Sequence, residues 1–177
     1  NAPTALEIEQ AIRNVPDFPK PGIQFKDITP VLADPRLFAG AVALMTDGHA
    51  PGTVDAVAGI ESRGFLFGMP LALRLGVPFL TVRKKGKLPY RTVSYKYDLE
   101  YGSAEIEMHV DVVCPGMRVL VHDDLLATGG TAAASAELIR MQGGQVAAFS
   151  FLVELSTLGG AERLRPYGAD ILRLVTY

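Results

Sequence analysis

Short apolar runs alternate along the sequence with stretches of helical spacing, and this alternation limits the possible folds. Residues 54–60 (VDAVAGI) are typical of a buried strand, residues 65–76 of a helix and residues 77–83 (VPFLTVR) of a second strand. A strand, a helix and a strand in this order form a parallel pair within one sheet. The sequence therefore predicts an α/β fold.

The same pattern continues in the C-terminal half of the chain. Strands are predicted at residues 117–123, 145–155 and 170–177, and a helix at residues 131–142. The predicted architecture is an open, mainly parallel, twisted sheet that is flanked by helices.

Residues 92–98 and 103–110 have a different pattern, in which apolar and polar residues alternate on either side of the tetrapeptide LEYG. This pattern predicts an antiparallel hairpin that projects from the parallel sheet. We call residues 84–110, which contain this hairpin, the flap.

Helical spacing also marks residues 5–15 and 35–49 near the N-terminus. The segment between them contains PDFPKPGIQFKD (residues 16–27), with three prolines and a glycine, and we predict a loop there.

The chain has 177 residues, of which 49% are hydrophobic, and we predict one domain over residues 1–177. It is divided into an N-terminal segment, residues 1–34, and a core, residues 35–177. The net charge of −2 gives no bulk attraction to nucleic acid or to an anionic membrane, so we expect neither as a partner.

Cys114 is the one cysteine of the sequence, which excludes an internal disulfide and favours a reducing compartment. Glu7 and Glu9 interrupt the N-terminal region where a signal peptide would need an apolar core. No window reaches the roughly 18 apolar residues of a membrane span. We therefore expect a cytoplasmic protein.

Chemically rich stretches follow several of the predicted strands: ESRGF at residues 61–65, RKKGK at residues 83–87 and DDLLATGGT at residues 123–131. In open parallel sheets, ligands bind beyond the carboxyl ends of the strands. We expect these stretches to converge in one cleft.

The last of these stretches has the composition of a phosphate site. Ala127, Thr128, Gly129, Gly130 and Thr131 would place backbone N–H groups and hydroxyls at a helix N-terminus, with glycines that allow close approach. The G-x-x-x-x-G-K-[ST] pattern of nucleoside triphosphate sites does not occur. A plain turn capped by a threonine is the alternative interpretation. We call residues 127–131 the phosphate loop.

Asp123 and Asp124 come just before the phosphate loop. Their carboxylates can accept hydrogen bonds from two neighbouring hydroxyls and can share a hard cation with a pyrophosphate. Phosphate, diol and metal together indicate a phosphorylated ribose. One solvated acid and one helix-capping acid would be the simpler interpretation.

The run VLVHDDLLATGGT (residues 119–131) resembles the phosphoribosyl-diphosphate signature of the type I phosphoribosyltransferases. The stretches PDFPKPGIQFKDITPVL, GIESRGFLFG, RKKGKLP, LEYG and LVEL, in this order, are similar to the adenine phosphoribosyltransferases over roughly residues 6–165. The resemblance implies transfer of a 5-phosphoribosyl group from phosphoribosyl diphosphate to adenine, giving AMP and pyrophosphate. It also implies Mg²⁺ bound mainly through the substrate, purine salvage, and a cytoplasmic homodimer.

The resemblance further implies roles for cationic residues. It assigns pyrophosphate binding to Arg63, Arg83, Lys84 and Lys87, some of them from across a dimer, and places Tyr101 over the diphosphate. It implies a cis peptide between Glu61 and Ser62. A structural ion pair of Arg63, or a solvated turn at RKKGK, is the alternative.

For the base, the resemblance implies that the N-terminal segment forms a hood in which main-chain groups of Gln24 and Lys26 read the adenine edge and Phe25 stacks on it. Leu155 or Leu158 would form the opposite wall. Glu100, in LEYG, would transfer a proton with the adenine ring when the flap closes, which makes it the predicted catalytic residue.

His122 departs from the family pattern, in which valine or isoleucine precedes the two acids, and we expect its ring to find a partner on the sheet face or at the dimer interface. Two other functions remain open. The first is phosphoribosyl transfer to another base, and the second is a nucleic-acid-binding regulator that keeps the fold.

Overall fold

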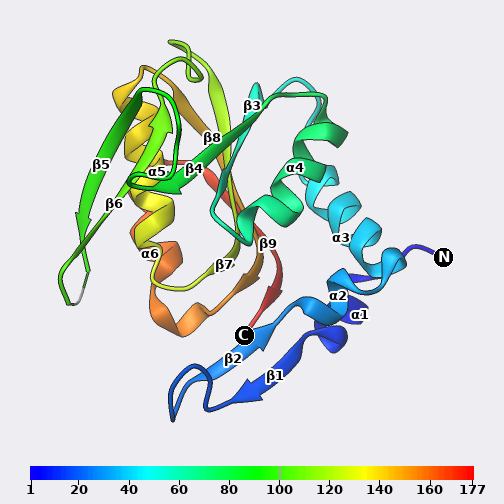
Figure 1. Cartoon of the computed structure of the whole chain (residues 1–177). Helices are drawn as coiled ribbons and strands as arrows, with labels where there is room; N and C mark the ends of the chain where they lie inside the picture. Colours follow the sequence, from blue (N-terminus) through cyan, green and yellow to red (C-terminus); the bar gives the residue numbers. More distant parts are fainter. Residues whose placement is uncertain (100) are drawn as a thin grey trace. The chain divides into compact units, whose positions relative to one another are not determined.

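The predicted alternation of strands and helices builds a mainly parallel sheet in the computed structural model, which describes residues 1–99 and 101–177 (Figure 1). The strands of this sheet lie in the order β5-β6-β4-β3-β7-β8-β9. They are β3 (Ala56–Ile60), β4 (Phe79–Lys84), β5 (Thr92–Asp98), β6 (Ser103–His109), β7 (Arg118–Leu126), β8 (Gln145–Glu154) and β9 (Asp170–Thr176).

The pairing confirms the predicted topology. Strands β4, β3, β7, β8 and β9 are paired in parallel, whereas β6 runs antiparallel to both β4 and β5. The predicted hairpin is therefore present as β5 and β6, at one edge of the sheet.

Helices cover the sheet, which explains why its central strands are continuous apolar runs rather than alternating ones. In the larger unit they are α4 (Gly64–Leu75), α5 (Gly130–Met141) and α6 (Gly160–Leu164), with short 3₁₀ turns η1 (Ser156–Leu158) and η2 (Arg165–Tyr167). Helix α3 (Pro35–Asp47) precedes β3 along the chain. Helix α4 packs on β3 and β7, and α5 packs on β7, β8 and β5.

Two glycines allow α4 to lie close to the sheet. A Cβ atom at Gly59 would come within 2.6 Å of the Phe79 ring, and one at Gly68 within 2.7 Å of the same ring. Any larger residue at either position would separate the helix from the strands. The close approach holds the N-terminus of α4, and therefore the ESRG turn, against the ends of β3 and β7.

Strand β7 is longer than predicted. It continues through Asp123 and Asp124 to Leu126, because its pairing with β8 extends as far as Leu126 and Glu154. The two acids therefore belong to the last part of a hydrogen-bonded strand, which fixes their backbone more firmly than a loop would.

The chain forms two compact units, Asn1–Leu44 and Met45–Tyr177, and their boundary falls within α3. The N-terminal unit thus extends beyond the segment that ends at residue 34 in the sequence prediction. It contains α1 (Ala5–Ala11), β1 (Arg13–Pro16), β2 (Gln24–Asp27), α2 (Thr29–Leu32) and most of α3.

Two predictions for the N-terminal unit are wrong. The first helix ends at Ala11 instead of Val15, and the segment predicted as a loop contains β2, which pairs antiparallel with β1. Ile12 is already extended, and Val15 pairs with Phe25. Ile12 and Val15 continue the helical spacing of apolar residues although they lie in or next to a short strand. The pattern alone therefore could not distinguish a helix from a strand at these positions.

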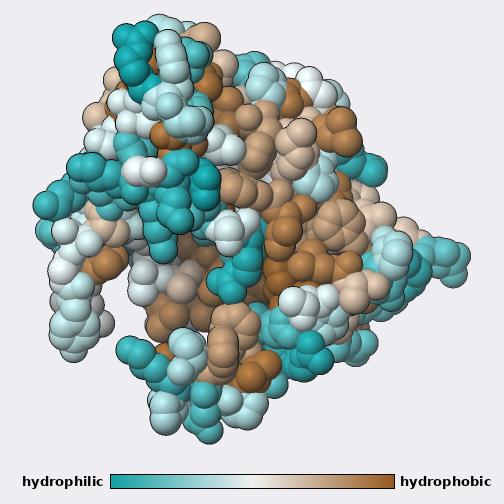
Figure 2. All heavy atoms as spheres, viewed as in Figure 1, coloured by the Kyte–Doolittle hydropathy of each residue, from teal (hydrophilic) through white to brown (hydrophobic). Residues whose placement is uncertain are grey.

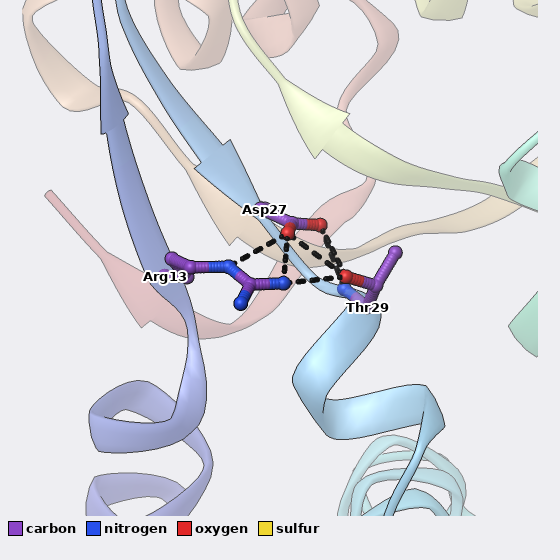
Figure 3. A network of polar contacts seen from close by, with 3 residues as sticks. All are labelled: Arg13, Asp27 and Thr29. Atoms are coloured by element: carbon purple, nitrogen blue, oxygen red, sulfur yellow. Dashed lines mark hydrogen bonds and ion pairs between the residues drawn. The ribbon is translucent and has the colours of Figure 1, made fainter.

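A polar network closes this hairpin (Figure 3). The guanidinium of Arg13 donates to Asp27 Oδ2 from Nη2 at 2.8 Å and from Nε at 3.1 Å, while the Thr29 backbone N–H donates to Asp27 Oδ1 at 2.9 Å. The Thr29 hydrogen bonds, followed by the one from Arg13, lower the pKa of the Asp27 carboxyl. The network joins β1, β2 and the start of α2.

No helix within residues 1–99 and 101–177 is long and apolar enough to cross a membrane.

His122 lies on β7 between Gly59 of β3 and Ser150 of β8. Its side chain is fully buried, and within the described part of the chain neither ring nitrogen has a hydrogen-bond partner. The ring is therefore enclosed by its own chain. Burial lowers the pKa of the His122 ring to about 3, and the nearby Ser150 backbone opposes this only in part.

We expect His122→Leu to reduce the loss of stability in acid. An unfolded histidine protonates below a pKa of about 6.5, whereas the folded ring stays neutral, so His122 costs up to about 1.4 kcal/mol per pH unit as the pH falls from there toward its folded pKa. Urea unfolding at pH 7.5 and pH 5 should show a smaller difference between the two pH values in the variant.

Ser150→Ala is the matched control for this experiment, because it removes a buried hydroxyl that does not titrate. It should change the unfolding free energy equally at both pH values. An unchanged pH difference in His122→Leu would contradict the account of the buried ring.

Candidate functional site

The predicted convergence of three stretches is confirmed. ESRGF, RKKGK and DDLLATGGT meet around a cavity of about 340 Å³, which we call the carboxylate cleft. It is lined by Glu61, Ser62, Arg63, Lys84, Asp123 and Asp124. A cavity of about 450 Å³ shares Glu61, Lys84 and Asp123 with it and extends to Thr131.

The carboxyl group of Asp123 has a strongly shifted pKa in this cleft. Burial raises the pKa of its carboxyl well above the ordinary value, and the adjacent Asp124 carboxylate raises it further. Asp123 Oδ1 accepts a hydrogen bond from the Asp124 backbone N–H at 2.8 Å. This oxygen lies only 3.0 Å from the position that a Cβ atom of Gly64 would occupy, so Gly64 leaves the space that the carboxylate fills.

Arg63 provides the positive charge nearest to these acids. Its Nε lies 3.0 Å from Asp124 Oδ2, and the Asp124 side chain is almost completely buried. The structural ion pair considered from the sequence thus exists, and it holds Arg63 inside the carboxylate cleft. The peptide between Glu61 and Ser62 is cis, as the resemblance implied.

Glu61 is a site residue that the sequence prediction did not assign, although it lies within the quoted ESRGF stretch. Its Oε1 accepts from the Lys84 backbone N–H at 2.7 Å and from Arg83 Nε at 3.2 Å. This carboxylate fixes the end of β4 against the ESRG turn. Arg83 is therefore partly neutralised by Glu61, whereas Lys84 lines the carboxylate cleft.

Glu107 of β6, also not assigned from the sequence, fixes the RKKGK turn. It accepts hydrogen bonds from the Gly86 backbone N–H and from the Thr92 hydroxyl, and these bonds, with Thr92 first, lower the pKa of its carboxyl. Lys87 is exposed, and its backbone carbonyl accepts from Arg83 Nη1 at 3.4 Å.

The phosphate loop surrounds a small cavity of about 100 Å³ before helix α5. Gly129 has a φ of +84°, and a Cβ atom there would lie 3.0 Å from the Gly160 carbonyl oxygen, so glycine is required. Thr131 stands in the first turn of α5, and its Oγ1 is 3.1 Å from the Tyr97 hydroxyl of β5. The predicted loop, with Ala127 and Thr128, therefore lies directly before the N-terminus of α5 and lines this cavity.

The tip of the flap is described only in part. Tyr101 is 88% exposed. Glu100 lies outside the described residues, so its assignment rests on the sequence.

The residues predicted to read a base lie on β2, within the N-terminal unit. Asn14 Nδ2 donates to Gln24 Oε1 at 2.8 Å, and Lys26 Nζ donates to Asn14 Oδ1 at 2.9 Å. Phe25 packs edge-on against Phe18, with ring centroids 5.1 Å apart. The Gln24 and Lys26 side chains thus share a polar network, while Phe25 belongs to an aromatic pair.

In the larger unit, Leu155 and Leu158 follow the carboxyl end of β8. Leu155 is half-buried and Leu158 is 48% exposed.

Comparison with known proteins identifies the family. Residues 32–170 match the model of the phosphoribosyl transferase domain. The adenine phosphoribosyltransferase of Cytophaga hutchinsonii is 52% identical over 170 residues, which cover 96% of this chain and 94% of that protein.

Solved structures agree. The crystal structure of adenine phosphoribosyltransferase from Thermoanaerobacter pseudethanolicus is 51% identical, with a TM-score of 0.91 over 98% of this chain and 100% of that one. The Saccharomyces cerevisiae adenine phosphoribosyltransferase, complexed with an imino-altritol bisphosphate and adenine, is 37% identical, with a TM-score of 0.89 over 96% and 97% of the two chains. With the carboxylate cleft and the phosphate loop in place, these matches show that the chain belongs to the adenine phosphoribosyltransferase family of enzymes.

Proposed function

We propose that this chain transfers the 5-phosphoribosyl group of phosphoribosyl diphosphate to adenine and forms AMP and pyrophosphate, in the presence of Mg²⁺. The observation that carries the proposal is the carboxylate cleft, in which two adjacent acids and Arg63 lie beside the phosphate loop. The single domain of residues 1–177, with the hood at residues 1–34, is part of the proposal.

The phosphate loop and the two acids divide the binding of the sugar between them. The backbone N–H groups of residues 127–131 and the hydroxyls of Thr128 and Thr131 suit the 5-phosphate. Asp123 and Asp124 accept hydrogen bonds from the ribose hydroxyls. Bound hydroxyls would replace part of the hydration that the half-buried Asp123 carboxylate has lost.

Arg63 and Lys84 bind the pyrophosphate, because both line the carboxylate cleft. Departure of pyrophosphate from the anomeric carbon builds negative charge on the leaving group, and fixed cations stabilise that charge. Arg63 exchanges its Asp124 partner for pyrophosphate oxygens while Asp124 turns to the ribose. Arg83, Lys87 and Tyr101 complete this site, with Lys87 and Tyr101 joining it when the flap closes or from a partner subunit.

The donor set fits Mg²⁺ bound through the substrate. Among the described residues, no group of three or more His, Cys, Asp or Glu side chains could hold a metal ion, but Asp123 and Asp124 offer adjacent carboxylate oxygens. Carboxylates and phosphate oxygens are the ligands that Mg²⁺ prefers. The ion would supply positive charge to the leaving pyrophosphate.

Adenine is read by the main chain of β2. Adenine presents an N6 donor and an N1 acceptor, whereas guanine reverses both, so a backbone C=O and N–H at Gln24 and Lys26 separate the two bases. Phe25 stacks on the base, and Leu155 or Leu158 provides an apolar wall. The relative from Saccharomyces cerevisiae was solved with adenine bound, which supports this choice of base.

Glu100 exchanges a proton with the adenine ring, since it is the acid of the flap sequence LEYG. A carboxylate that acts mainly in the transition state changes kcat more than KM when it is removed.

The enzyme forms a cytoplasmic homodimer that acts in purine salvage. Helix α4 exposes Leu66, Met69 and Leu73 on one face, at 41%, 54% and 78% of their surface. Figure 2 shows hydrophobic residues gathered over this helix. An apolar stripe of this kind favours burial against a second copy. The lone Cys114 fits a reducing compartment.

Incubation with phosphoribosyl diphosphate, Mg²⁺ and each purine in turn tests the activity. We expect AMP from adenine and at least about 10⁴-fold lower kcat/KM with guanine or hypoxanthine. Turnover of guanine or xanthine instead of adenine would contradict the choice of base, and no turnover with any base would favour a regulator.

Glu100→Gln should lower kcat more than it raises KM for adenine.

We expect Asp123→Asn to stabilise the protein while weakening phosphoribosyl diphosphate binding. The pKa of Asp123 is raised in the folded state, so its ionisation opposes folding at neutral pH, and this cost disappears as the pH falls below the ordinary pKa of about 3.9. The gain in Tm should therefore be larger at pH 7.5 than at pH 4.5, with about 2–4 °C for each kcal/mol.

Asp124→Asn is the comparison for this variant, because it loses the ion pair with Arg63 and should not raise Tm. A fall in the Tm of Asp123→Asn at pH 7.5, or unchanged kinetics with phosphoribosyl diphosphate, would show that the buried carboxylate has another role.

We expect Leu73→Glu to dissociate the dimer, because it would place a charge on the exposed apolar stripe that we propose as the contact. Light scattering after size exclusion should give one-chain mass for this variant and two-chain mass for the parent. Leu6→Glu, on α1, changes another exposed leucine and should leave the dimer intact. A monomeric parent, or a dimeric Leu73→Glu, would argue against this interface.

A further inference from the structure

A tyrosine of the flap hairpin contacts the phosphate loop. Tyr97 belongs to β5, and its hydroxyl lies 3.1 Å from Thr131 Oγ1, with both side chains half-buried. Strand β5 packs against α5, the helix that begins at the phosphate loop. This hydrogen bond connects two elements to which the proposed function gives different tasks.

Tyr97 also lines two cavities. The first, of about 450 Å³, is lined by Lys84, Asp123 and Thr131 as well. The second, of about 300 Å³, is also lined by Gly130 and Arg163. Its ring therefore forms part of the wall beside the phosphate loop, and a shift of β5 would move the partner of Thr131.

The chemistry of the two hydroxyls makes this contact sensitive to a bound phosphate. Each hydroxyl has one proton to donate, and in the free protein either oxygen can be the donor. Phosphate oxygens of a dianion only accept, so Thr131 must donate its proton to a bound phosphate. Thr131 Oγ1 can then only accept from Tyr97, and the bonds run in one direction from Tyr97 through Thr131 to the phosphate.

Hydrogen bonds aligned in this way polarise and strengthen one another. A bound phosphate therefore strengthens the Tyr97–Thr131 bond, and a firmly held Tyr97 orients the Thr131 hydroxyl toward the phosphate. Because Asp98 ends β5 and the sequence LEYG follows, the strand held by this bond leads directly into the tip of the flap.

We propose that Tyr97 is a positioning residue, which orients Thr131 for the 5-phosphate and couples phosphate binding to the order of the β5–β6 hairpin. The inference rests on the proposed function of the phosphate loop. According to this proposal, the flap responds to the bound 5-phosphate of the sugar donor. The response passes through Thr131 and does not require contact between the flap and the reacting atoms.

Tyr97→Phe tests the proposal, because it removes the hydroxyl and keeps the ring in the wall. Amide hydrogen exchange is measured with and without saturating ribose 5-phosphate, in the segments 92–99 and 127–135. In the parent protein, ribose 5-phosphate should slow exchange in both segments. In Tyr97→Phe it should protect residues 127–135 alone, and its Kd should rise by about 3- to 10-fold, as expected for one lost hydrogen bond.

Tyr95→Phe is the matched control. Tyr95 lies on the same strand and lines the same cavity as Gly130 and Arg163, but within the described residues its hydroxyl does not bond to Thr131. This variant should behave as the parent does. Protection of 92–99 in Tyr97→Phe equal to that of the parent, or its loss in both variants, would overturn the coupling.

The same data separate this inference from the proposed function. If ribose 5-phosphate fails to protect residues 127–135 in the parent, the phosphate loop is misassigned, and the coupling falls with it. If the loop is protected in the parent but residues 92–99 do not respond, the phosphate loop stands and the role of Tyr97 is wrong.

Discussion

The placement of two adjacent carboxylates at the end of β7, with Asp124 buried and Asp123 half-buried, is the constraint that shapes the site. Asp123 and Asp124 repel each other, and burial raises the pKa of the Asp123 carboxyl well above its ordinary value. The fold tolerates them because Arg63 pairs with Asp124 and the Asp124 backbone N–H donates to Asp123. Such an arrangement lowers the stability of the free protein, and it suits a site in which bound hydroxyls and a cation compensate the two carboxylates.

The neighbouring cations are arranged by carboxylates of their own. Glu61 holds the end of β4 through Lys84 and Arg83, and Glu107 holds the turn at Gly86. These two acids stand outside the sugar site but determine where its positive charges lie. Neutral hydrogen-bond partners could fix the backbone equally well, but carboxylates also offset the repulsion among clustered Arg and Lys side chains.

Much of the fold could be predicted because apolar periodicity reports burial. The parallel strands, the helices between them and the antiparallel hairpin followed from that pattern, and the family resemblance supplied the cis peptide at Glu61–Ser62. The N-terminal hairpin could not be predicted, because the spacing of Ile12 and Val15 suits a helix as well as a strand. The hydrogen-bond partners of Arg83 and Tyr97 could not be predicted either, because they come from segments that are distant in the sequence.

Local sequence was enough to identify two acids before a small-residue loop, a cationic turn, and the family in which they occur together. These are local features, and the chemistry of adjacent residues does not depend on the rest of the fold. The pairing of charges, Arg63 with Asp124 and Arg83 with Glu61, and the complete burial of His122 follow only from the folded chain. Burial and pairing across the sheet arise only when strands from distant parts of the chain lie side by side, so no local pattern can encode them.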